Sequence, residues 1–73
     1  MIHPLSNFKK YTFTINKHDY CKQQPWLHNN LLLVAEWWDL QPNPTTHHYE
    51  FTCLRMDAYQ VEKIFKKFKV KIY

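Results

Sequence analysis

Four side chains in this 73-residue sequence have the chemistry of metal ligands: His18, Cys21, His47 and His48. Imidazole nitrogen and thiolate sulfur are the ligands that Zn²⁺ takes in tetrahedral protein sites. The topology derived below brings the end of the first strand beside the start of the third, and so predicts that these residues meet at one edge of a sheet. Their spacing lacks the Cys-x-x-Cys and His-x-x-x-His halves of known structural sites. We therefore predict a cluster of these side chains, but no metal and no cofactor.

The thiol and imidazole of Cys21 and His18 are also the best candidates for a nucleophile and its base. Support for catalysis ends there, because the acidic residues stand isolated in sequence and the lone serine, Ser6, lies in an N-terminal stretch without a predicted element. The chain contains no glycine, which phosphate loops, the dinucleotide fingerprint and the nucleophile elbow all require. We predict a protein that binds and is not an enzyme.

The formal net charge is +4, and basic residues gather at both ends of the chain while the middle is acidic. Such a surface favours nucleic acid, anionic lipid or an acidic protein, and charge alone does not choose among them. One basic group is a candidate for phosphate contact: Lys63, Lys66, Lys67, Lys69 and Lys71. The first three are predicted on the solvent side of a helix and the last two on the open face of a sheet, so they form no continuous stripe.

Composition predicts a single cytoplasmic domain over residues 1–73. Hydrophobic residues make up 45% of the chain, and the two cysteines are expected to be reduced thiols. No stretch reaches the roughly 18 apolar residues of a membrane helix, and the N-terminus lacks the layout of a secretory signal. We expect no membrane partner.

The first elements follow from alternation and capping. Residues 11–15 alternate large apolar side chains with threonine, which predicts a strand with Tyr11, Phe13 and Ile15 inward. A short helix is predicted over residues 16–24, with the asparagine at its start as cap.

Residues 31–40 are apolar apart from two acidic side chains, and they fit either a buried strand or a helix. The proline-containing stretch 41–46 has the composition of a turn, which favours a hairpin whose second arm is 47–56. In that arm, alternate residues are predicted on the core face: Tyr49, Phe51 and Cys53.

Asp57 and Gln60 have the spacing of a capping box and predict the start of a helix that ends near Phe68. Its apolar residues follow at helical spacing: Val61, Ile64, Phe65 and Phe68. Residues 69–73 alternate again and predict a closing strand.

This order predicts a small α+β fold of the ferredoxin-like βαββαβ type. Its four-stranded antiparallel sheet has the order 4-1-3-2, with both helices on one face. The alternative is a three-stranded sheet with two helices, in which residues 26–40 form a long first helix.

In a strand, Trp37 and Trp38 point to opposite faces. We expect Trp37 to face the helices with Leu33 and Ala35. The open face would then carry an apolar patch that binds a partner: Trp38, Leu32, Val34 and Leu54. In the alternatives, both tryptophans belong to the core of a helix, or an N-terminal segment around Leu5 and Phe8 covers the patch.

These features predict a small protein-binding module that acts stoichiometrically and occludes a site on a larger target. Its size, abundant aromatics and basic surface resemble in general character the anti-CRISPR and anti-restriction inhibitors of phages and mobile elements. A homodimer through the open sheet face is a further prediction. The alternative function is sequence-nonspecific nucleic-acid binding through the C-terminal lysines.

Overall fold

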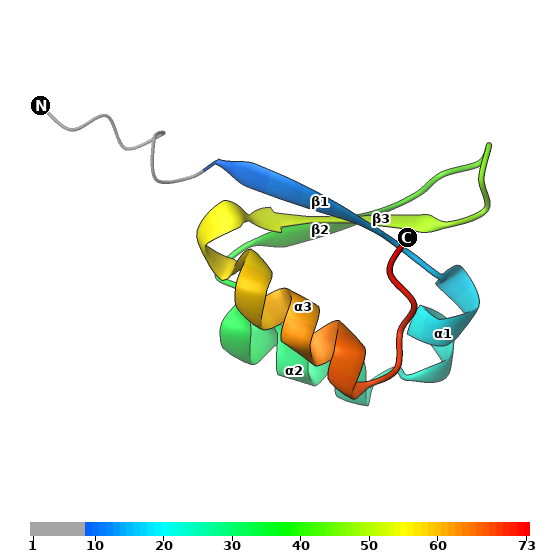
Figure 1. The fold of residues 1–73 in the computed structure, drawn as a ribbon. Coiled ribbons are helices and arrows are strands. Elements are labelled where there is room, and N and C mark those ends of the chain that lie inside the picture. Colours follow the sequence, from blue (N-terminus) through cyan, green and yellow to red (C-terminus); the bar gives the residue numbers. More distant parts are fainter. Residues whose placement is uncertain (1–8) are drawn as a thin grey trace, which may run out of the picture.

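The structure, a computed structural model, describes residues 9–73 and has an α+β fold in which three helices lie on one side of a three-stranded antiparallel sheet (Figure 1). The elements in chain order are β1 (Lys10–Ile15), α1 (Lys17–Lys22), α2 (Trp26–Val34), β2 (Trp38–Pro42), β3 (Tyr49–Leu54), the 3-10 turn η2 (Arg55–Asp57) and α3 (Ala58–Lys67). The sheet order is β1-β3-β2. The α+β class is confirmed, with the three-stranded sheet of the alternative prediction.

Strand β1 lies where its alternation predicted, and it pairs with β3 so that Phe13 is opposite Phe51. Phe13 and Ile15 are buried, as expected, but Tyr11 is 45% exposed. Its ring contacts the edge of the Phe13 ring with 4.8 Å between centroids. The inward prediction for Tyr11 is therefore wrong, although the tyrosine is on the same side of the strand as the buried residues.

The first part of residues 31–40 is helical, so the predicted strand is wrong for residues 31–34 and correct only from Trp38 onward. Leu27 and Leu31 are four residues apart and both fully buried, which is the periodicity of a helix face. A run of consecutive leucines fits the periodicity of a helix and that of a strand equally well. Here the helix forms because one of its faces, with Leu27 and Leu31, packs into the buried core.

The predicted fourth strand is reduced to one bridge, between Ile15 and Ile72. Two backbone bonds flank it: Asn16 N donates to Lys71 O at 2.9 Å, and Tyr73 N donates to Thr14 O at 2.8 Å. The segment therefore lies beside β1, as the order 4-1-3-2 required. Val70 belongs to the C-terminal cap of α3, so pairing with β1 begins only after it.

Helix α3 carries its buried residues, Val61 and Phe65, on the predicted face. The predicted capping box is wrong: Asp57 Oδ2 accepts a hydrogen bond from Glu36 N at 3.1 Å, and no side chain caps α3. Asp57 ends η2 with helical dihedral angles, whereas a capping side chain needs an extended backbone.

Helix α1 does have the predicted cap, because Asn16 is extended and its Oδ1 accepts from Asp19 N at 2.9 Å. The helix ends at Lys22, two residues before the predicted end. Within the part of the chain that the structure describes, eleven buried residues form the core between sheet and helices: Phe13, Ile15, Tyr20, Leu27, Leu31, Ala35, Phe51, Cys53, Val61, Phe65 and Val70. Within residues 9–73, no helix has the length and apolar character needed to cross a membrane.

Candidate functional site

The four residues of the predicted apolar patch do not form one surface. Trp38 is half-buried, and its ring stacks on core residue Phe51 with 5.2 Å between centroids. Val34 packs against the core, and Leu54 is only 6% exposed. Leu32 alone is well exposed, at 59%, and it lies on α2 and not on the sheet. The geometric basis of the predicted patch is therefore wrong.

The open face of the sheet is polar because the register places threonine and charged residues there. Opposite the core-facing positions lie Lys10, Thr12, Thr14, Asp39, Gln41, Glu50 and Thr52. The Thr12 and Thr52 hydroxyls are hydrogen-bonded across β1 and β3 at 2.9 Å. Among residues 9–73, the predicted homodimer through this face would thus meet mainly polar side chains.

Large apolar side chains are exposed at one end of the molecule, which we call the apolar end: Tyr11, Leu32, Leu33, Trp37, Met56 and Tyr59. These are six of the eight large apolar residues that are exposed within residues 9–73; the other two are Trp26 and Tyr73. The apolar end is where β1 begins, α2 ends and α3 begins, on the left of Figure 1.

Specific contacts bring these segments together. The bond from Glu36 N to Asp57 Oδ2 joins the α2–β2 connection to the start of α3, so the neighbouring Trp37 and Met56 lie on adjoining segments. Lys10 Nζ lies 4.7 Å from the centroid of the Trp37 ring, which links β1 to the same connection. Three segments that are distant in sequence therefore contribute to one end of the domain.

The sequence prediction missed the apolar end because it assigned residues 31–34 to a strand. Leu33 and Trp37 were expected to face the helices, but they are 84% and 40% exposed. On a helix, Leu33 lies seven residues after the exposed Trp26 and on a different face from buried Leu27 and Leu31. The helical reading would have identified Leu33 as exposed. Ala35 is buried, as expected.

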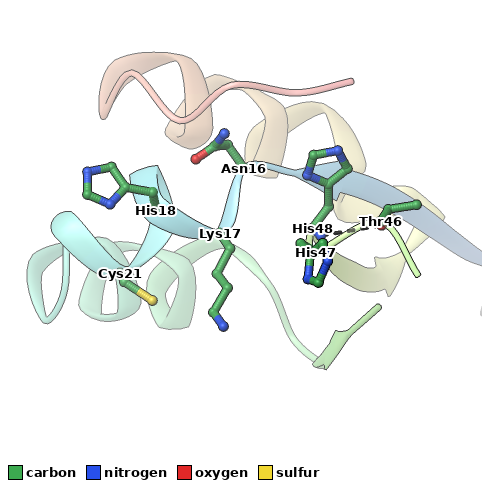
Figure 2. A pocket seen from close by; sticks show the side chains of 7 residues that line it. All are labelled: Asn16, Lys17, His18, Cys21, Thr46, His47 and His48. Carbon is green, nitrogen blue, oxygen red and sulfur yellow. Dashed lines mark hydrogen bonds between the residues drawn. The ribbon is translucent and has the colours of Figure 1, made fainter. Parts of the chain in front are cut away.

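The predicted histidine and cysteine cluster lies around one open pocket between α1 and the β2–β3 turn (Figure 2). All four predicted residues are among its lining: Asn16, Lys17, His18, Cys21, Thr46, His47 and His48. Their nearness was correctly predicted. In Figure 2, His18 points away from the two turn histidines, which themselves point in opposite directions. No group of three or more potential ligands in residues 9–73 is arranged to hold a metal ion.

The pocket thiol has a phenol neighbour. Cys21 Sγ lies 3.7 Å from Tyr49 Oη, and this hydrogen bond is the main reason why the pKa of Tyr49 is raised. His48 instead stacks on Tyr73, with 4.0 Å between ring centroids. Among the hydrogen bonds of residues 9–73, none joins Cys21 to His18, as a nucleophile and its base would require. The other residues named in the sequence predictions, Leu5, Ser6 and Phe8, lie outside the described residues.

The C-terminal lysines do not form one stripe, as the sequence indicated. Lys66 pairs with Glu62 at 3.0 Å, and Lys63 lies over the Tyr59 ring at 4.9 Å. Lys71 Nζ lies over the Tyr73 ring on the C-terminal segment, away from α3. Lys67 and Lys69 are exposed at the end of α3.

Comparisons with family models, curated proteins and solved structures found no match to this chain. The function must therefore be argued from the two surfaces described above, the apolar end and the pocket.

Proposed function

We propose that this protein is a non-enzymatic protein-binding module that uses its apolar end to occlude a site on a larger target. The observation that carries this proposal is the concentration of exposed apolar side chains: six of the eight within the described residues lie at the apolar end. Small proteins seldom expose large apolar residues together, and where they do, the patch often marks an interaction site.

The residue types at the apolar end support a protein partner. Trp37, Tyr11 and Tyr59 provide large rigid rings, and tryptophan and tyrosine are enriched among the residues that dominate interface energies. Lys10 and Lys63 lie over two of these rings, at 4.7 and 4.9 Å. Their charges would surround the apolar contact and favour approach to an acidic surface.

The test compares two exposed tryptophans at opposite ends of the segment formed by α2 and its connection to β2. Trp37→Ala removes a ring of the apolar end, and Trp26→Ala removes a ring that is 66% exposed outside it. Wild type and both variants are used as baits in lysate of the native host, with quantitative mass spectrometry. We expect a protein that wild type and Trp26→Ala retain and that Trp37→Ala loses.

The interaction is then measured with the purified partner by calorimetry. Trp37→Ala or Leu33→Asp should cost about 2 kcal/mol or more of binding free energy, and Trp26→Ala less than about 0.5 kcal/mol. Melting temperatures of Trp26→Ala and Leu33→Asp should stay near that of wild type, because those side chains are mostly exposed. Trp37→Ala should also lower the melting temperature, because Trp37 is only 40% exposed, so Leu33→Asp is the variant that isolates the loss of binding from a loss of stability. Equal losses for Trp37→Ala and Trp26→Ala would contradict the proposed interface.

The nucleic-acid alternative is separated by charge reversal and salt. Lys66 and Lys67 are exposed on α3 and lie outside the apolar end, and their simultaneous replacement by glutamate should change partner affinity by less than about 1 kcal/mol if the target is a protein bound at the apolar end. Loss of all binding in this variant, together with affinity for DNA or RNA that falls steeply with salt, would replace the protein-binding proposal.

A further inference from the structure

The pocket between α1 and the β2–β3 turn is a second candidate for binding, separate from the apolar end. Its volume is about 460 Å³, larger than a single oxyanion requires and within the range of small-molecule sites. It lies at the end of β1 where α1 begins, whereas the apolar end lies where β1 starts. The two surfaces therefore do not share residues.

The chemistry of the lining is that of a site for an anion. Among the seven lining residues, Lys17 provides a permanent positive charge, and the others contribute imidazoles, a hydroxyl, an amide and a thiol. None of the seven carries a carboxylate. The carboxylates on α1 and β3 accept hydrogen bonds from groups outside the lining: Asp19 Oδ2 from Lys71 N at 3.0 Å, and Glu50 Oε2 from Asn43 Nδ2 at 2.7 Å.

Several lining groups keep donors available for a ligand. Thr46 Oγ1 accepts a hydrogen bond from His48 N at 3.3 Å, which leaves its own proton free to be donated. Lys17 and His47 are exposed, and in Figure 2 their side chains extend to the same side of the pocket, as does the Cys21 sulfur. The ammonium of Lys17 lies 5.8 Å from the Tyr49 ring centroid and is engaged in no ion pair among the described residues.

The turn that presents these donors is held in place by its own hydrogen bonds. Asn43 Oδ1 accepts from Thr45 N and Thr46 N, and His47 N donates to Asn43 O at 2.8 Å. His47 has a φ of 62°, a left-handed conformation that is costly for residues other than glycine. A preorganised loop loses less conformational entropy when a ligand binds.

We propose that this pocket binds a small molecule bearing a phosphate monoester, with the oxyanion contacted by Lys17, Thr46 and His47. The ammonium of Lys17 would form a charge-assisted hydrogen bond to such an oxyanion, and bonds of this kind are about twice as strong as those between neutral groups. The remaining volume would accommodate the organic substituent of the ester. A cation is disfavoured, because the lining contains no carboxylate to neutralise it.

The test uses phenyl phosphate as the probe in a nuclear magnetic resonance titration of amide signals at constant ionic strength, with sodium chloride as the matched salt. We expect saturable shifts centred on Lys17 and Thr46 to His48. Lys17→Gln should weaken binding about fivefold or more, as expected for loss of a charged hydrogen bond. His47→Asn should have a similar effect, since asparagine tolerates the left-handed backbone while removing the imidazole.

The matched control is Lys63→Gln, which removes one exposed lysine of α3 and should leave affinity within about twofold of wild type. A short single-stranded oligonucleotide is titrated in parallel, because its phosphates are a second source of the same chemistry. Three results would each overturn the proposal: shifts that do not saturate, shifts centred on α3, or binding of the oligonucleotide alone.

Discussion

Lys69 lies just after α3 in a position where glycine is the usual residue, and we expect its replacement to change the stability of the protein. It follows α3 with a φ of 57°. Lys69 N donates to Lys66 O at 3.1 Å, and Val70 N donates to Phe65 O at 2.8 Å. These two bonds form a Schellman motif, in which the left-handed position is usually glycine. Val70 and Phe65 are both buried, which provides the accompanying apolar contact.

Lys69→Gly should therefore stabilise the protein relative to Lys69→Ala, a comparison in which the lysine charge is absent from both variants. The left-handed backbone costs a residue with a Cβ about 1–2 kcal/mol. Glycine loses about 0.4–1 kcal/mol of this advantage through the greater freedom of the unfolded chain. The net gain is about 0.8 kcal/mol, which corresponds to about 3–6 °C in melting temperature for a domain of this size.

The assay is urea denaturation followed by circular dichroism, with the same pair of substitutions at Lys63 as the control. Lys63 lies inside α3 and is exposed, and there glycine should be less stable than alanine by about 1 kcal/mol. The sign of the glycine effect should thus reverse between two lysines six residues apart. If Lys69→Gly is less stable than Lys69→Ala, the left-handed cap and the reasoning based on it are refuted.

Three further outcomes are expected. Cys21 is exposed and Cys53 is buried, so native protein should react with one equivalent of Ellman's reagent at once and with the second only on unfolding; rapid reaction of both thiols would contradict the burial of Cys53. Burial, and secondarily Asp57, raises the Cys53 pKa from 9.0 to about 11. Because the folded state favours the neutral thiol, this shift contributes about 2–3 kcal/mol to the free energy of unfolding below pH 9, and the contribution is lost as pH rises toward 11. Urea midpoints should fall over that window more in wild type than in Cys53→Ala, and parallel pH profiles would refute the assignment. Asp57→Ala should cost about 1 kcal/mol and shift the amide signal of Glu36 more than that of Gln60; the opposite ranking would restore the capping box.

Local sequence patterns correctly predicted the elements that are specified within a few residues. The alternation of residues 11–15 identified β1, and the helical spacing of Val61 and Phe65 identified the inner face of α3. The Asn16 cap was also correctly predicted. In the strand and the helix the pattern and the backbone conformation have the same period, and the cap depends on residues three positions apart, so no distant contact was needed to choose between alternatives.

The candidate surfaces were predicted less well because exposure depends on which element covers which. The ligand-type residues were correctly expected to meet, since antiparallel topology brings the end of β1 near the turn before β3. Their directions, and hence their failure to converge on a metal, follow from side-chain orientations that sequence does not specify. Prediction of the apolar end required residues 31–34 to be assigned to a helix, and the sequence pattern fits a helix and a strand equally well.

The sequence by itself determined the α+β class and the positions of β1, β3 and α3, because these depend on residue types and short-range periodicity. It also indicated that His18, Cys21, His47 and His48 meet. Tertiary structure decided that the leucines before Trp37 form a helix, that Trp38 and not Trp37 joins the core, and that exposed apolar residues gather at one end. The physical reason is that a continuous apolar run satisfies both helical and extended periods. Only packing against α3 and the sheet determines which side chains lose contact with water.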